Sequence, residues 1–222
     1  MQLAPRKAST SRKRKDVAPG DATADEMDAL AALADRFSFG ELRVTHKQNL
    51  VLPQVARAEL RDLWQALDDL GLARANIEMA SDIICCPGGD FCSLANARSI
   101  PLSAAIAERL APIEDDLGPI AIKVSGCINA CAHHHVGHIG VLGVEKAGED
   151  WFQVMLGGRP DEGGRLGVLI GKAVRAPEVA PLIERIARHY LAVRQDGESF
   201  IAATERLGAQ SFKAALEQAE AA

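Results

Sequence analysis

Four of the five cysteines in this chain stand in two short glycine-bearing segments, and their spacing constrains the fold more than any other feature. The first segment reads CPGGDFC from Cys86 to Cys92, and the second reads GCINAC with Cys127 and Cys131. Thiolates grouped in this way usually bind metal in cytosolic chains, where disulfides are rare. No apolar segment of the kind found in a secretion signal follows the N-terminal charges, so we expect a cytoplasmic protein.

The spacing of the cysteines bears on which metal they bind. Structural zinc sites mostly use pairs separated by two to four residues, whereas five residues separate Cys86 from Cys92. An iron–sulfur cluster is larger, and its ligands reach separate corners of a cube, so wider spacing suits it. Neither of the common ferredoxin spacings matches this chain. Spacing alone therefore favours an iron–sulfur cluster and leaves zinc open as the alternative.

Composition excludes two broad classes of function. The chain has 222 residues, a formal net charge of -5 and an ordinary hydrophobic content of 48%, so its overall charge does not predict nucleic-acid binding. No apolar run approaches the roughly 18 residues of a membrane span. Residues 1–35 begin with a cluster of six lysines and arginines that has no apolar partners, and we expect a mostly disordered, solvated tail there.

The first half of the chain alternates between extended and helical patterns. Residues 25–36 predict a short helix, and residues 41–55 read as extended structure interrupted at Pro53. Leucines at helical spacing predict a helix over residues 57–72, capped at its C-terminus by Gly71. A further extended segment is expected at residues 75–79. This order of elements suggests half of a ferredoxin-like α+β unit.

The second half predicts an α/β arrangement around the cysteines. A helix is expected to begin near Ser99 or Pro101, and residues 119–124 (PIAIKV) predict a buried strand that leads into the second cysteine segment. A hairpin with its turn at Ala147 and Gly148 should follow. The C-terminal part predicts helices over residues 177–193, 199–207 and 211–219.

Several long motifs resemble one family. The segments CPGGDFCSLANARS and SGCINACAHHHVGHIG resemble the sirohaem and [4Fe-4S] region of nitrite and sulfite reductases, and LRVTHKQNLVL resembles a strand of that family's ferredoxin-like half-domain. The resemblance covers about residues 37–215 and is strongest to bacterial assimilatory sulfite reductase haemoproteins. It implies an α+β fold, with a ferredoxin-like half-domain at residues 36–80 followed by an α/β sirohaem and [4Fe-4S] domain at residues 81–222.

The resemblance also implies roles for individual residues. Four cysteines would hold a [4Fe-4S] cluster, and the last of them would also bridge to the sirohaem iron as the catalytic link; they are Cys86, Cys92, Cys127 and Cys131. Cys85 would be spare. Sirohaem carries many carboxylates, so its pocket needs cations and backbone donors. We expect Arg43, Gln48 and Asn129 to contact it, ahead of Thr45, Lys47, Asn49 and Arg98.

The implied reaction is the six-electron reduction of sulfite to sulfide. Nitrite reduction to ammonia is the close alternative, and a non-catalytic iron–sulfur or zinc module is a second. The implied partners are the substrate anion and an electron donor, either a flavoprotein subunit or ferredoxin. Because the chain resembles only the C-terminal copy of a unit that usually occurs twice, it is expected to be a fragment, to pair with a separate N-terminal half, or to be a compact enzyme.

A run of three histidines, His133 to His135, follows the second cysteine pair. Consecutive residues point in different directions, so such a run seldom chelates one ion. Its position next to Cys131 suggests a structural or proton-supplying role.

Overall fold

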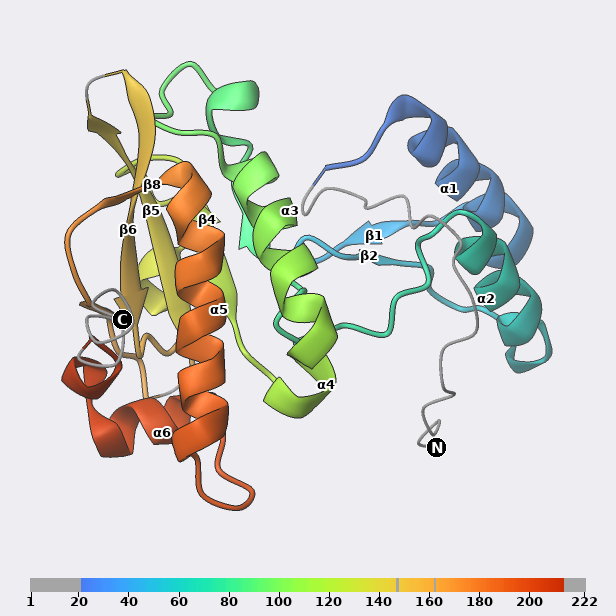
Figure 1. Ribbon diagram of the computed structural model, residues 1–222. Coiled ribbons are helices and arrows are strands. Elements are labelled where there is room, and N and C mark those ends of the chain that lie inside the picture. Colours follow the sequence, from blue (N-terminus) through green and yellow to red (C-terminus); the bar gives the residue numbers. More distant parts are fainter. Residues whose placement is uncertain (1–20, 147, 162, 214–222) are drawn as a thin grey trace.

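The computed structural model describes residues 21–146, 148–161 and 163–213. Figure 1 shows a smaller part built from α1, β1, β2 and α2 beside a larger part in which helices cover a sheet. The α+β organisation predicted from the sequence is confirmed: two helices and a hairpin, called the half-domain below, come first, and a mixed sheet covered by helices follows. The expectation of a disordered basic tail falls mainly on residues 1–20, which lie outside the described part.

The half-domain starts with α1 (Ala24–Phe37), where the predicted helix lies. Its first turn is held by a capping box, in which the Thr23 and Glu26 side chains each bond the backbone N–H of the other. The hairpin of β1 (Arg43–Val44) and β2 (Leu50–Val51) follows. Next come a 3-10 turn η1 (Arg57–Glu59) and α2 (Leu60–Asp69), which together replace the single helix expected over residues 57–72.

The segment expected to be extended at residues 75–79 forms turns instead, with one isolated bridge between Met79 and Pro119. Asp82 explains this outcome, because its side chain accepts the Glu78 backbone N–H at 2.8 Å and its own backbone N–H donates to the Met79 carbonyl at 3.0 Å. Local turns of this kind compete with strand pairing. The segment leads directly into the larger domain.

A six-stranded mixed sheet forms the larger domain. Its strands run in the order β3 (Ile84–Cys85), β4 (Ile122–Ser125), β5 (Ile139–Lys146), β6 (Glu149–Leu156) and β7 (Val168–Leu169), and β8 (Val174–Arg175) also pairs with β6. The first three strands are parallel, and β5 and β6 form the predicted antiparallel hairpin. Its turn was expected at Ala147 and Gly148, of which Ala147 lies outside the described residues.

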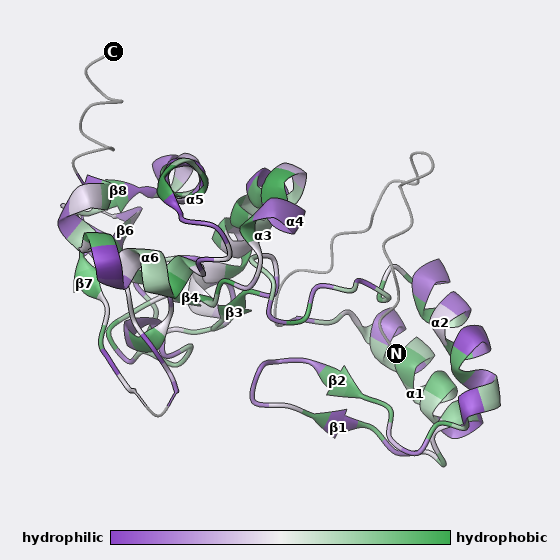
Figure 2. Cartoon of the chain, turned by 90° about the horizontal axis from the view of Figure 1, so that it is seen from below, coloured by the Kyte–Doolittle hydropathy of each residue, from purple (hydrophilic) through white to green (hydrophobic). Residues whose placement is uncertain are grey.

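Helices cover one face of this sheet, as Figure 2 shows for α3, α4 and α5. The predicted helices are α3 (Ser99–Leu110) and α5 (Ala176–Val193), while α4 (Glu114–Leu117) adds one turn after the 3-10 segment η3 (Ala111–Ile113). Ile122 and Val124 of β4 point into the core on this side, among residues such as Ile106 and Ile183. The opposite face of β4 therefore carries Lys123 and Ser125.

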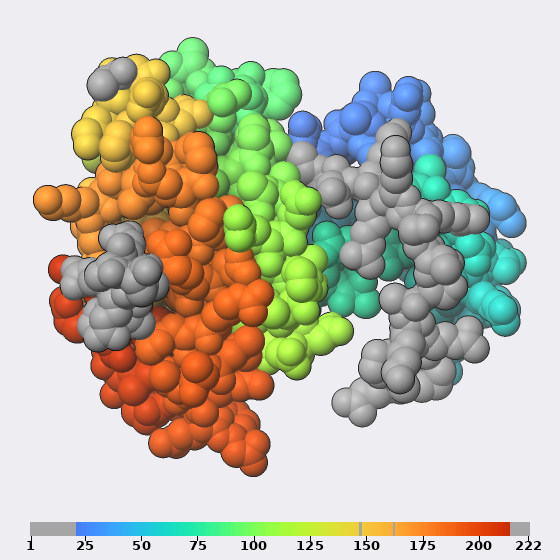
Figure 3. Space-filling model, in the orientation of Figure 1, coloured from blue at the N-terminus to red at the C-terminus, as the bar shows by residue number. Residues whose placement is uncertain are grey.

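Two shorter segments complete the chain. The helix α6 (Phe200–Leu207) begins at Ser199, whose side chain caps it, in agreement with the prediction. Residues 209–213 are helical, and the rest of the helix expected at 211–219 lies outside the described part. None of the helices in the described ranges is long and apolar enough to cross a membrane. Figure 3 shows the half-domain, in blue to teal, as a lobe beside the larger green-to-red domain.

Candidate iron–sulfur site

The two cysteine segments begin at the same edge of the sheet. The strands β3 and β4 are parallel neighbours, with Cys85 opposite Val124, so Cys86 and Cys127 follow the carboxyl ends of adjacent strands. In α/β sheets, sites are built at these ends because the loops leaving them converge. The local chain direction therefore brings together cysteines that are far apart in the sequence.

Direct hydrogen bonds join the two cysteine loops. The backbone N–H of Gly126 donates to the Cys86 sulfur at 3.1 Å, and the Cys86 sulfur also lies 3.3 Å from the Ser99 hydroxyl oxygen. In return, the backbone N–H groups of Asn96 and Ala97 donate to the Gly126 carbonyl at 2.9 and 3.1 Å. A sulfur that accepts a backbone N–H is the environment that iron–sulfur proteins use to tune their clusters.

Gly126 lies where no side chain fits. A Cβ atom at this position would lie 2.7 Å from the Ala97 carbonyl oxygen and 3.0 Å from the Gly88 Cα atom. The close approach of the two loops thus depends on a missing side chain. The glycine that precedes Cys127 in the sequence motif has a physical role in joining the loops.

The four candidate ligands range from buried to exposed. Cys86 and Cys127 are buried, Cys92 is half-buried and Cys131 is exposed, and all of them are free thiols. In the described part of the chain, no three His, Cys, Asp or Glu side chains are grouped so that they could hold a metal ion. An all-thiolate set spread over two joined loops fits an iron–sulfur cluster better than a single zinc ion, because a cluster takes its ligands at separate corners.

Cys85 is buried like its neighbour Cys86, but it lies in a different environment. It belongs to β3 and to the hydrophobic core cluster, and only 2% of its surface is exposed. Burial raises the pKa of its thiol to about 11. A thiol that stays protonated inside the core is a poor metal ligand.

The three side chains predicted to contact sirohaem lie in different surroundings. The Gln48 amide bonds both backbone groups of Cys85, donating to its carbonyl at 2.7 Å and accepting its N–H at 2.9 Å. Arg43 is exposed on β1 and pairs with Glu41 at 2.6 Å. Asn129 is exposed between Cys127 and Cys131. Of the three, Asn129 is the one that lies between two candidate cluster ligands, and the contacts of all three with sirohaem stay predictions.

Gln48 serves as the link between the half-domain and the edge strand β3. Its backbone is in the left-handed region, with φ at +60°, which places the amide against Cys85. Gln48→Ala should lower the free energy of unfolding by about 1–2 kcal/mol, because two partly buried hydrogen bonds are lost. Urea denaturation of the apo-chain measures this. The control is Gln65→Ala, which removes one exposed bond to Asp69; equal effects of the two substitutions would contradict the proposed link.

The histidine run occupies a strained turn. Ala130 and His133 both have positive φ angles, +56° and +55°, and the 3-10 segment η4 (His134–Val136) follows. His133 is exposed, His134 is completely buried and His135 is half-buried, so the three rings lie in different environments. Neither ring nitrogen of His134 has a hydrogen-bond partner in the described part of the chain. The histidines therefore do not form one chelating group.

His134 should make stability depend on pH. Burial lowers the pKa of its imidazole to about 4 from an ordinary value of 6.5. Below pH 6.5 the unfolded chain takes up a proton at this side chain, whereas the folded chain does not until about pH 4. Stability should thus fall as the pH drops through this window. Melting temperatures of the apo-chain should fall less in His134→Leu, while the exposed control His133→Leu should follow the wild type.

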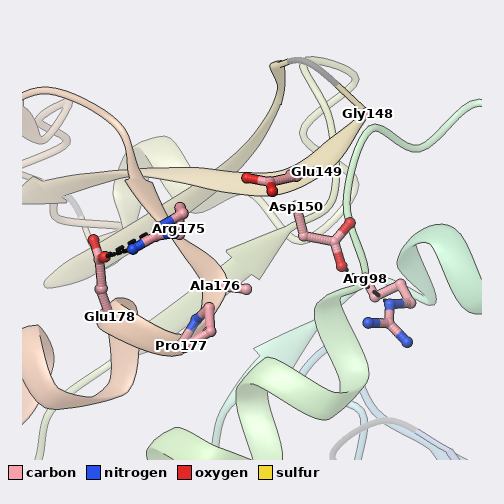
Figure 4. Close-up of a pocket in the computed structure, with 8 residues that line it drawn as sticks. All are labelled: Arg98, Gly148, Glu149, Asp150, Arg175, Ala176, Pro177 and Glu178. Atoms are coloured by element: carbon pink, nitrogen blue, oxygen red, sulfur yellow. Dashed lines mark hydrogen bonds and ion pairs between the residues drawn. The ribbon is translucent and has the colours of Figure 1, made fainter.

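A surface pocket of about 620 Å³, with no cysteine among its lining residues, lies between the start of α3, the β5–β6 turn and the start of α5 (Figure 4). Its cations are already paired, Arg98 with Asp150 at 3.0 Å and Arg175 with Glu178 at 3.0 Å. Arg98, a further candidate for binding sirohaem carboxylates, is thus engaged on this side.

Sequence reasoning missed Lys123. It stands in the buried strand β4, and 9% of its surface is exposed. A lysine inside an apolar run such as PIAIKV is itself a signal, because lysines are almost never buried without a partner. This residue lies four positions before Cys127.

Residues 81–221 match the model of the nitrite and sulphite reductase 4Fe-4S domain, and residues 16–70 match that of the nitrite/sulfite reductase ferredoxin-like half domain. The chain belongs to this family. The family's cofactors are a [4Fe-4S] cluster and sirohaem, as the sequence resemblance implied.

Individual relatives include both kinds of reductase. The chain is 31% identical over 174 residues to the chloroplastic ferredoxin–nitrite reductase of Arabidopsis thaliana, covering 75% of this chain and 30% of the relative. It is 32% identical over 183 residues to sulfite reductase [ferredoxin] 2 of Mycolicibacterium paratuberculosis, covering 78% and 33%. The solved structure of the Mycobacterium tuberculosis NirA protein matches with a TM-score of 0.71 and 28% identity, over 83% of this chain and 36% of that one.

These coverages show that the chain spans about a third of the length of its relatives. The crystal structure of dissimilatory sulfite reductase I shares the fold at 14% identity, with a TM-score of 0.68.

Proposed function

We propose that this chain is the cofactor-binding part of a sirohaem-dependent sulfite reductase, acting in the reduction of sulfite to sulfide. The observation that carries the proposal is the hydrogen bond from the Gly126 N–H to the Cys86 sulfur, which joins the two cysteine loops. The match to the 4Fe-4S domain family supports the interpretation that the joined loops bind an iron–sulfur cluster.

The protein's own contribution is to hold and tune the ligands. Cys86, Cys92, Cys127 and Cys131 would hold the cluster, and Cys131, the exposed thiol, would also bind the sirohaem iron. The Gly126 N–H stabilises negative charge on the Cys86 sulfur. When bound, the two groups supply electrons to the substrate one at a time.

The surface next to the cysteines suits a large flat ligand. Phe91, Leu94 and Ile128 are 72%, 69% and 80% exposed on the two cysteine loops. Apolar side chains gathered at a surface mark binding sites for ligands or partners. The residues present thus fit both cofactors of the family.

Nitrite reduction is the second candidate function. The supporting observation is that a ferredoxin–nitrite reductase is as similar to this chain as the sulfite reductases are, at 31% and 32% identity. We favour sulfite because the cysteine motifs resemble those of bacterial sulfite reductases.

We further propose that ferredoxin or a flavoprotein subunit donates the electrons, and that this chain acts together with a separate N-terminal half. Two observations support this proposal: the relatives are named for ferredoxin, and the chain spans about a third of their length. Five free thiols and a cluster site suit the reducing cytoplasm, which is the location we propose.

Anaerobic reconstitution of the full chain with iron, sulfide and sirohaem tests the proposal. The expected product is brown-green, with a Soret band, and contains iron and labile sulfide. Oxidation of reduced methyl viologen by sulfite and by nitrite then separates the two candidate reactions. A colourless zinc protein would contradict the proposal, and a brown protein without a Soret band would indicate a cluster-only electron-transfer module.

A further inference from the structure

Three buried polar side chains without partners lie on the side of the sheet opposite to α3 and α5. Lys123 and Ser125 belong to β4 and are 9% and 0% exposed, and His134 of η4 is 0% exposed. Among the residues that the structure describes, the Ser125 hydroxyl and both His134 ring nitrogens have no hydrogen-bond partner. Buried polar groups in folded proteins are nearly always satisfied, so a cluster of exceptions needs an explanation.

The segment containing His134 covers this face closely. Gly140 lies beside Lys123 across the β4–β5 pairing, and a Cβ atom at Gly140 would lie 2.1 Å from the His134 carbonyl oxygen. A Cβ atom at Gly137 would lie 3.2 Å from the Lys123 Cβ atom. Lys123 is therefore enclosed between its own sheet and the turn that follows Cys131.

The charge of Lys123 is uncompensated. Within the described residues, its ammonium group makes no ion pair and no hydrogen bond, and the charge acting on it is a second cation, Lys47. Burial lowers the pKa of Lys123, and Lys47 adds to this effect. Lys47 itself pairs with Glu78, so that carboxylate is already engaged. A buried cation without a counter-charge is destabilising unless something else supplies negative charge.

We propose that Lys123, Ser125 and His134 form a buried binding site for one carboxylate or one small oxoanion. Lysine supplies the positive charge, the serine hydroxyl donates one hydrogen bond, and the neutral imidazole donates another from a ring N–H. The anion is either a carboxylate of the tetrapyrrole or free sulfite. In the first case the inference rests on the proposed function; in the second it does not.

Acetylation of lysines in the full apo-chain, followed by mass spectrometry, tests the site. Uroporphyrin III, an iron-free tetrapyrrole with carboxylates, and sodium sulfite are the two probes. One of them should slow acetylation of Lys123 by about tenfold without affecting the exposed Lys172. Protection by uroporphyrin alone identifies a tetrapyrrole carboxylate, and protection by sulfite identifies a free oxoanion. Unchanged acetylation with both probes would overturn the proposal.

The variant Lys123→Met gives an independent reading. Without a probe it should melt at a higher temperature than the wild type, because a buried unpaired charge is replaced by an apolar chain of similar size. The probe that protects Lys123 should raise the melting temperature of the wild type and of Lys172→Met by the same amount. It should not raise the melting temperature of Lys123→Met. Equal probe-induced shifts in wild type and Lys123→Met would overturn the proposal. If the variant does not fold, the acetylation experiment on the wild type still decides.

The two proposals fail separately. A chain that takes up cluster and sirohaem while Lys123 stays unprotected would retain the proposed function and lose this site. A chain that takes up neither cofactor, but in which sulfite protects Lys123, would retain the site and lose the function.

Discussion

Cys86→Ser is expected to remove most of the iron and labile sulfide from the reconstituted chain. The Cys86 sulfur is buried just after β3 and accepts the Gly126 N–H, so it lies at the junction of both loops. A serine hydroxyl is a harder ligand than a thiolate and keeps its proton at neutral pH, so it binds iron clusters poorly. We expect about a tenfold lower iron content per chain, measured by iron and sulfide assays after anaerobic reconstitution.

Cys85→Ser is the matched control, because it changes the adjacent thiol in the same way. Cys85 lies within the core, with the pKa of its thiol raised to about 11. This variant should keep its full iron and sulfide content, although a buried hydroxyl will lower its stability. If Cys85→Ser lost the cluster and Cys86→Ser kept it, the assignment of the ligand next to Pro87 would be wrong.

Gly126→Ala is expected to separate the two cysteine loops. The new methyl group would lie 2.7 Å from the Ala97 carbonyl oxygen, and backbone at this point cannot yield as a flexible side chain can. Overpacking of this kind destabilises a protein by about 1–3 kcal/mol. Because the shift also weakens the bond from the Gly126 N–H to the Cys86 sulfur, iron content should fall together with stability.

Gly171→Ala provides the comparison. A Cβ atom at Gly171 would meet no described residue within 4 Å, and the Gly171 backbone is outside the left-handed region. This variant should unfold in urea at the wild-type midpoint or slightly above it, since alanine restricts the unfolded chain. Similar losses of stability in both variants would show that the loop contact at Gly126 has no special role.

The regular elements of the fold were largely predictable from local pattern. The helices α1, α3, α5 and α6 lie where apolar periodicity and capping residues placed them. The prediction of an extended segment at residues 75–79 was wrong, because the side chain of Asp82, outside that segment, bonds the Glu78 backbone N–H in a turn. Periodicity carries no information about such bonds.

The candidate site was predictable only in part. The cysteine loops follow from the motifs, and their mutual contact follows from two parallel strands ending together. The two hydrogen bonds between the Gln48 amide and the Cys85 backbone could not be predicted, because they depend on how the half-domain packs against β3. Lys123 was missed because the apolar residues around it predict a strand whether or not its charge has a partner.

The contact between Gly126 and Cys86 has a consequence for the order of events during maturation. Because the backbone of one loop bonds a sulfur of the other, the two loops are held together by the protein's own atoms. A cluster that binds here would therefore not have to close the long loop between Cys86 and Cys127 by itself. The rate of cluster insertion should therefore depend on the concentrations of iron and sulfide, and it should change little at low concentrations of urea.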